Sequence, residues 1–202
     1  PVTNSLGTLT CTSANDSRAG CQPGFVRKLG PADTPDECVP EGLREQLLFS
    51  LAQEISSMNI SVTDPETVSF FVSSLMESTS GTSFSADATD VGLKSLEVLT
   101  SVPLTAESAP VAGEVVSNLL RASAHLYEQE GLSLDGNNTR SDEAAKTNGV
   151  RRAKALTAVL KTVLVAFAAD RPANTTQVEL ATDKFTLSAH FPPRGGLTGA
   201  SL

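Results

Sequence analysis

The sequence predicts a mainly α-helical fold: a bundle of about five helices followed by a β-hairpin, with a small disulfide-stapled N-terminal segment. Apolar residues recur at helical spacing through the middle of the chain. Their period changes to two after Pro172, and all three cysteines lie near the N-terminus. The expected divisions are a cysteine-rich loop segment at 1–39, a helical bundle at 40–171, and a hairpin with a Gly-rich tail at 172–202.

Composition limits the class of partner. A chain of 202 residues, 40% hydrophobic and 19% charged, is long and apolar enough to bury a core. Its formal charge of -8 argues against nucleic acid and anionic lipid surfaces, because both are bound through clustered Lys and Arg. The most apolar stretch, Ala155 to Ala169, contains Lys161 and is shorter than the roughly 20 residues that cross a bilayer. We therefore expect no nucleic-acid partner and no membrane span.

The cysteines indicate disulfide bonding in the N-terminal segment. Cys11, Cys21 and Cys38 lie among Gly, Pro, Asp and Thr residues. This segment has too few apolar residues to form a core by itself. Zinc is the competing interpretation, but the gaps exceed Cys-x2-Cys spacing and no His lies near. The connectivity stays open, and an odd count leaves one thiol unpaired or bonded outside the chain.

The cysteine segment also resembles known modules. The run CQPGF from Cys21 to Phe25, followed by ECVP from Glu37 to Pro40, is similar to the Cys-x-Pro-Gly-aromatic pattern of small EGF-like and ephrin-receptor-like modules. The resemblance implies that Pro-Gly makes a turn and that a disulfide holds the loop.

Two helices are expected before residue 80. The first, at 40–59, places Pro40 in its first turn. Its apolar stripe consists of Leu43, Leu47, Leu51, Ile55 and Met58. The second begins with Asp64 as N-cap and Pro65 at its first position. Its apolar face consists of Val68, Phe71, Val72 and Leu75.

Three further helices complete the expected bundle. The third carries Val91, Leu96, Leu99 and Val102 and stops at Pro103. The fourth runs from a Thr105 cap to Gly131, with a solvent face of Glu114, Asn118, Arg121 and Glu128 and an apolar stripe of Ala112, Val115, Val116, Leu119, Leu120, Ser123 and Leu126. A solvated polar loop is expected at 132–148. The fifth helix, at 150–169, uses Ala153, Leu156, Leu160, Val163, Leu164 and Phe167, and the basic residues Arg151, Arg152 and Lys154 lie at its end.

The end of the chain predicts two strands. Val178 and Leu180 alternate with polar residues, as do Phe185, Leu187 and Ala189, and 181–184 form the turn between them. An isolated hairpin is only marginally stable in water. We therefore expect residues 177–190 to complete a β-sheet supplied by sequence outside this chain, from the same polypeptide or from a protein partner.

The order of these elements resembles a known family. Amphipathic helices followed by VELATDKFTLSAHF, from Val178 to Phe191, are similar to the helical first half of a GAIN domain and the opening strands of its β-sandwich, over residues 41–191. GAIN domains are extracellular modules of adhesion G-protein-coupled receptors and polycystin-like proteins. Their self-cleavage motif has an aliphatic residue and then Ser or Thr after His, whereas Phe191 and Pro192 follow His190 here. The resemblance therefore does not imply self-cleavage.

Sequons point to the cell exterior. Asn15, Asn59, Asn137 and Asn174 each stand in an Asn-x-Ser/Thr pattern that accepts N-linked glycans. No basic leader followed by an apolar core opens the chain, so we expect any signal peptide to be absent or already removed. The predicted location is extracellular or at the cell surface, with a cilium or flagellum included.

The functional hypothesis follows from these features. We expect a non-enzymatic structural or adhesion module, a piece of a larger surface or matrix glycoprotein, with no catalytic residues, metal or cofactor. One alternative is a secreted helical enzyme or ligand carrier with a cavity between helices two, four and five, in which His125 meets a carboxylate or a Ser hydroxyl. Another is an intracellular helical adaptor whose sequons arise by chance.

Overall fold

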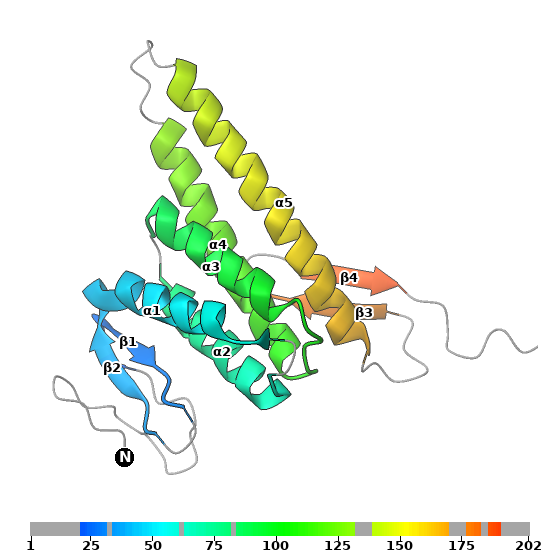
Figure 1. The fold of residues 1–202 in the computed structure, drawn as a ribbon. Helices are drawn as coiled ribbons and strands as arrows, with labels where there is room; N and C mark the ends of the chain where they lie inside the picture. Colours follow the sequence, from blue (N-terminus) through cyan, green and yellow to red (C-terminus); the bar gives the residue numbers. More distant parts are fainter. Residues whose placement is uncertain are drawn as a thin grey trace, which may run out of the picture.

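A computed structural model gives the fold of this protein (Figure 1). It describes residues 21–31, 34–60, 63–81, 84–131, 139–169, 177–182 and 186–190. Within them lie five α-helices and two antiparallel hairpins, so the mainly α-helical prediction is confirmed. The helices are α1 (Arg44–Ser57), α2 (Pro65–Thr79), α3 (Ala86–Leu99), α4 (Ser108–Gly131) and α5 (Thr139–Ala169). The strands are β1 (Phe25–Lys28), β2 (Glu37–Pro40), β3 (Gln177–Ala181) and β4 (Thr186–His190), and a 3-10 turn, η1 (Glu41–Leu43), precedes α1.

Local side-chain caps fix where three helices begin. Asp64 accepts a hydrogen bond from the Thr67 amide at 2.8 Å, with Pro65 in the first turn of α2, as predicted. Ser85 caps α3 by accepting from the Ala88 amide. At α4, Thr105 Oγ1 accepts from the Ser108 amide at 3.1 Å, while Ser108 Oγ accepts from the Thr105 amide at 2.9 Å. This reciprocal pair is a capping box with Ser in the usual Glu position.

The core forms around α4, which packs against α2, α3 and α5. It is almost wholly aliphatic, because Phe71 and Phe84 are the only aromatic residues in the buried cluster of the described chain. The cluster consists of Leu48, Ile55, Val68, Phe71, Val72, Leu75, Phe84, Ala88, Leu93, Leu96, Leu99, Leu104, Ala109, Ala112, Val115, Val116, Leu119, Ala122, Leu156, Val159 and Val163. In Figure 1, α4 and α5 run side by side and extend together beyond the other helices.

The predicted start and stripe of the first helix are wrong in part. Pro40 lies in β2, opposite Phe25, and α1 begins only at Arg44. Leu43 is 41% exposed, whereas Leu48, outside the predicted stripe, is fully buried. The buried face of α1 runs through Leu48 and Ile55. Leu47 and Leu51 are only half-buried.

Three further helix predictions need correction. The loop expected at 132–148 is helical from Thr139, because Glu143, Ala144, Ala145 and Lys146 are strong helix formers and α4 supplies a neighbour along much of α5. Helix α3 begins at Ala86 and ends at Leu99, before Val102. The predicted solvent face of α4 also fails at Asn118, which is buried and donates to Thr79 Oγ1 at 3.4 Å.

The C-terminal hairpin was predicted, and the N-terminal one was not. The predicted hairpin is confirmed, with Leu180 opposite Leu187 and Val178 opposite Ala189. Ala181, expected in the turn, lies instead in β3 opposite Thr186. Residues 25–28 and 37–39, expected as loop, form β1 and β2 together with Pro40, and Val26 lies opposite Val39. Neither FVRK nor ECVP alternates apolar with polar residues, so the period of two that indicates a strand is absent from both. Across the described helices, none is long and apolar enough to span a membrane.

Candidate functional site

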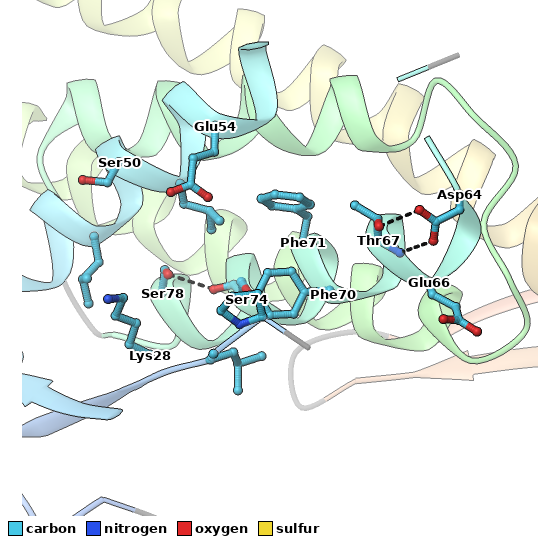
Figure 2. A pocket seen from close by; sticks show the side chains of 15 residues that line it. Lys28, Ser50, Glu54, Asp64, Glu66, Thr67, Phe70, Phe71, Ser74 and Ser78 are labelled. Atoms are coloured by element: carbon cyan, nitrogen blue, oxygen red, sulfur yellow. Dashed lines mark hydrogen bonds between the residues drawn. The ribbon is translucent and has the colours of Figure 1, made fainter. Parts of the chain in front are cut away.

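A pocket of about 980 Å³ lies between α1, α2 and the loop after β1 (Figure 2). Its apolar lining consists of Leu29, Pro31, Leu47, Leu51, Phe70 and Phe71. The rings of Phe70 and Phe71 meet edge to face, with centroids 5.4 Å apart. Leu47 and Leu51 belong to the stripe that the sequence assigned to the core. The pocket therefore combines half-buried apolar residues such as Leu47, Leu51 and Phe70 with Phe71, which belongs to the buried cluster.

Polar groups of the pocket come from three elements. Ser50 and Glu54 lie on α1, Lys28 on β1, and the remainder at or along α2: Asp64, Glu66, Thr67, Ser74 and Ser78. Ser74 is 7% exposed, and its Oγ is buried with no hydrogen-bond partner in the described part of the protein. The neighbouring Ser78 hydroxyl donates instead to the Ser74 carbonyl at 2.8 Å (Figure 2). An unsatisfied buried hydroxyl facing a pocket is the kind of group that a ligand satisfies.

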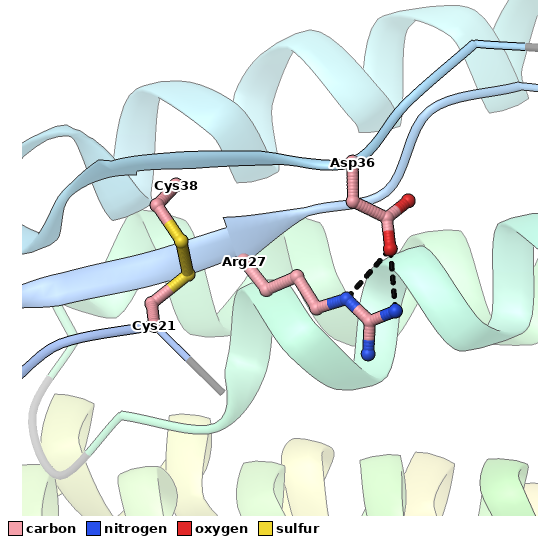
Figure 3. The surroundings of a disulfide bond; sticks show 4 residues. All are labelled: Cys21, Arg27, Asp36 and Cys38. Carbon is pink, nitrogen blue, oxygen red and sulfur yellow. Dashed lines mark hydrogen bonds and ion pairs between the residues drawn. A yellow bond between two sulfur atoms is a disulfide. The ribbon is translucent and has the colours of Figure 1, made fainter. Parts of the chain in front are cut away.

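The N-terminal hairpin is held by a disulfide between Cys21 and Cys38 (Figure 3). Phe25 N donates to Gln22 O at 3.1 Å across Pro23 and Gly24, and Gly24 has φ 86°. Pro then Gly with positive φ is the signature of a type II turn, as the module resemblance implied. Cys11 lies outside the described residues, so its partner stays a prediction.

An ion pair fastens the loop of this hairpin. Arg27 Nε donates to Asp36 Oδ2 at 2.7 Å, and its Nη2 contacts the same oxygen (Figure 3). Asp36 Oδ1 accepts from the Gly30 amide at 3.0 Å. The carboxylate thus closes the loop and holds the backbone that forms one wall of the pocket.

Charged residues also meet where the hairpin faces α2. Burial raises the pKa of the Glu77 carboxyl; Arg27 and Arg44 act to lower that pKa, and Asp36 acts to raise it. Arg44 itself pairs with Glu41 at 3.2 Å, and its side chain is 12% exposed. Glu77 is therefore a half-buried acid whose ionisation responds to the packing of β1 against α2.

A second charged cluster joins α3 to α5. The guanidinium groups of Arg151 and Arg152 both bind the Asp90 carboxylate, and Arg152 is only 3% exposed. This basic cluster was expected at a helix end, but α5 begins at Thr139, so the cluster lies in the interior of the helix. The pairing of Arg152 with Asp90 could not be predicted from the sequence, because the two residues are 62 positions apart in the chain.

The β3–β4 hairpin forms the other candidate interface. It contacts α5, and within the described residues no further strand pairs with the outer edge of either strand. Exposed positions on it include Gln177, Glu179, Ser188 and His190. The hairpin thus presents two strand edges whose backbone groups have no strand neighbour in the described chain.

Of the four predicted glycan sites, one falls on described residues. Asn59 follows the end of α1 and is exposed. Asn15, Asn137 and Asn174 lie outside the described residues.

Metal-ligating residues and the position of the pocket bear on the alternative of a helical enzyme or ligand carrier. In the described ranges no group of three or more His, Cys, Asp and Glu residues is arranged to hold a metal ion. The pocket lies between α1, α2 and the β1 loop instead of between the second, fourth and fifth helices, and His125 does not line it. This pocket is therefore not the cavity between the second, fourth and fifth helices that the alternative of a helical enzyme or ligand carrier predicts.

Comparison with family models, with curated proteins and with solved structures found no match to this chain.

Proposed function

We propose that this chain is a non-enzymatic extracellular module of a larger cell-surface or matrix glycoprotein that engages protein through its β3–β4 hairpin. The observation that carries the proposal is the two-stranded sheet at the end of the helical bundle, whose outer edges meet no other strand in the described residues. Exposed strand edges present rows of backbone donors and acceptors and pair readily with a further strand.

The side chains of the hairpin favour pairing through the edges. Its exposed positions are mainly polar, with Gln177, Glu179 and Ser188 among them. A polar face gives a partner little hydrophobic area, whereas main-chain hydrogen bonds give affinity irrespective of side chain. Two strands alone are only marginally stable, and in the described chain this hairpin is supported by its contact with α5 and by no further strand. A third strand, from flanking sequence or from a partner, would stabilise the hairpin.

The extracellular location rests on the disulfide and on the glycan sites. Disulfides persist in oxidising compartments, and Cys21–Cys38 staples a hairpin that has little core of its own. Asn59 is exposed at a helix end, where a glycan would meet no steric obstacle from the core. The GAIN-like order of helices and strands favours an adhesion-receptor or polycystin-like ectodomain, one on a cilium or flagellum included.

Backbone-amide hydrogen exchange tests the strand pairing. The exchange of peptides covering 177–182 and 186–190 is compared between the isolated chain and the protein purified from its native surface with its flanking sequence and partners. We expect protection of both strands to rise about tenfold or more on assembly. Peptides from α3 serve as the control and should not change. Equal exchange of the hairpin in both samples would contradict the proposal.

Glycopeptide mass spectrometry tests the location separately. Secretion from eukaryotic cells should yield a glycan on Asn59 and a linked Cys21–Cys38 peptide, and Asn59→Gln should remove only that glycan. Bare sequons together with a free Cys21 thiol would instead support the intracellular adaptor.

A further inference from the structure

We propose that the pocket between α1, α2 and the β1 loop binds a small amphiphilic organic cation. Its apolar body would lie against Phe70, Phe71 and Leu51, and its positive end near Asp64 and Glu66. The proposal does not rest on the pairing of the β3–β4 hairpin, because the lining residues lie on other elements.

The size and lining of the pocket fit a small molecule. Ligand sites occupy about 300–1,000 Å³ and combine mostly apolar walls with a few placed polar groups. This pocket has a volume of about 980 Å³, and aliphatic and aromatic side chains from α1, α2 and the β1 loop form its walls. Leu47, Leu51 and Phe70 are half-buried, so a bound apolar body would remove more of their surface from water.

Ser74 provides an independent sign of a missing ligand. Its side chain is more than nine-tenths buried, it lines the pocket, and its Oγ has no hydrogen-bond partner in the described chain. Helical Ser residues often satisfy their hydroxyl on the carbonyl four residues earlier, as Ser78 does on Ser74. Ser74 does not do so. Its hydroxyl is therefore available to a polar atom in the body of a ligand.

Charge selects a cation over an anion. Three carboxylates, Glu54, Asp64 and Glu66, line the pocket beside one ammonium, Lys28, which leaves a net formal charge of -2. Lys28 Nζ lies 3.3 Å from Glu37, so its charge is partly compensated. Asp64 and Glu66 lie together at one end of the pocket, away from Lys28 (Figure 2).

The start of α2 does not offset this negative end. A helix N-terminus ordinarily attracts anions through its free amides. Here the Asp64 carboxylate accepts from both the amide and the hydroxyl of Thr67, at 2.8 and 2.7 Å. These hydrogen bonds lower the pKa of Asp64, so the carboxylate stays ionised. An anionic headgroup would meet carboxylates at this end of the pocket.

Matched amphiphiles test the proposal. Decyltrimethylammonium and decyl sulfate share an apolar chain and differ in headgroup sign, and each is titrated below its micelle concentration by calorimetry. We expect saturable one-to-one binding of the cation and an affinity for the anion at least about tenfold lower. Because the chain has no Trp, Phe70→Trp adds a single fluorophore at the pocket for a second readout.

Two pairs of variants localise the binding. Ser50 is an exposed pocket residue, so Ser50→Trp should lower the affinity for the cation about tenfold or more without disturbing the core. Ser57→Trp, on the same helix but outside the pocket lining, should leave the affinity for the cation unchanged. Glu66→Gln should weaken the cation severalfold, whereas Glu97→Gln on α3 should leave it unchanged.

A third comparison tests Ser74. An analogue of the cation with an ether oxygen within its chain should bind more tightly than decyltrimethylammonium, and Ser74→Ala should remove that advantage. Equal affinity for cation and anion, binding that survives Ser50→Trp, or no saturable binding would overturn the proposal. An ether analogue with no advantage in the parent protein would contradict the role of Ser74.

Discussion

Arg152 of α5 and Asp90 of α3 form a two-pronged ion pair. Arg152 Nε lies 2.7 Å from Oδ1, and Nη2 lies 3.3 Å from Oδ2. Arg151 adds a further hydrogen bond of 2.6 Å to the same carboxylate. Because Arg152 is only 3% exposed, its charge depends on Asp90 for compensation.

Removing the carboxylate should destabilise the bundle. Asp90→Asn leaves the buried Arg152 charge without a counter-ion, and we expect a loss of about 3 kcal/mol in the free energy of unfolding. Urea unfolding measures it. Asp87→Asn, exposed on the same helix, should cost about 0.5 kcal/mol or less. Asp90→Leu combined with Arg152→Leu should recover much of the loss, since both charges are then absent. A cost no larger than that of the control would show that the pair contributes little.

The same pair predicts a dependence on acid. Burial alone would raise the pKa of Asp90, but hydrogen bonds from Arg152 and Arg151 outweigh it and lower the pKa below 3.8. A lowered folded-state pKa gives stability that is full above the unfolded value and is lost as pH falls through the folded value. The stability difference between the parent and Asp90→Asn should therefore shrink below about pH 4. A difference constant from pH 7 to pH 2 would contradict this.

Glu77 should show the opposite dependence. Burial raises its pKa above 4.5, despite Arg27 and Arg44. Its contribution to stability is therefore full below pH 4.5 and declines as pH rises through the raised pKa. Relative to the parent, Glu77→Gln should gain stability between pH 4 and pH 7, as read from melting temperatures at both values. Glu97→Gln changes an exposed residue, so its melting temperature should differ from that of the parent by the same amount at pH 4 and at pH 7. The same result for Glu77→Gln would contradict a raised pKa of Glu77.

The turn before β1 should require glycine. Gly24 has φ 86°, a conformation that costs an L-residue about 1–2 kcal/mol, and an added Cβ would meet nothing within 4 Å. Gly24→Ala should therefore destabilise the hairpin through its backbone alone. Gly42→Ala also adds its Cβ to open space, but without positive φ, and should be neutral or slightly stabilising. Unfolding and amide exchange of 25–28 compare the two, and equal effects would exclude the turn as the cause.

Loss of the disulfide should loosen the N-terminal hairpin. Cys21 and Cys38 are 17 residues apart, and closing a loop of this size contributes about 3 kcal/mol. Replacing both by Ser should release β1 and β2 to fast exchange, while α3 and α4 keep their protection. Cys11→Ser serves as the control and should leave the hairpin unchanged. A Cys11 bond to either partner in peptide mapping would refute this connectivity.

The sequence by itself determined the features that depend on neighbouring residues. The cap at Asp64, the buried face of α2, the end of α4 at Gly131 and the presence of a C-terminal hairpin all follow from short-range patterns. Capping and periodicity act within a few residues, so they are readable without a fold. The pairing of β1 with β2 is not readable in this way, because neither FVRK nor ECVP alternates apolar with polar residues.

Only the tertiary structure decided which apolar and charged residues meet. It buried Leu48 and left Leu47 and Leu51 to line the pocket, because the packing of α1 on α2 and α3 decides which of its apolar residues are covered. It also brought Arg152 to Asp90 and buried Asn118 against Thr79. Such contacts join residues far apart in the chain, and their geometry follows from how whole helices pack, which no local pattern specifies.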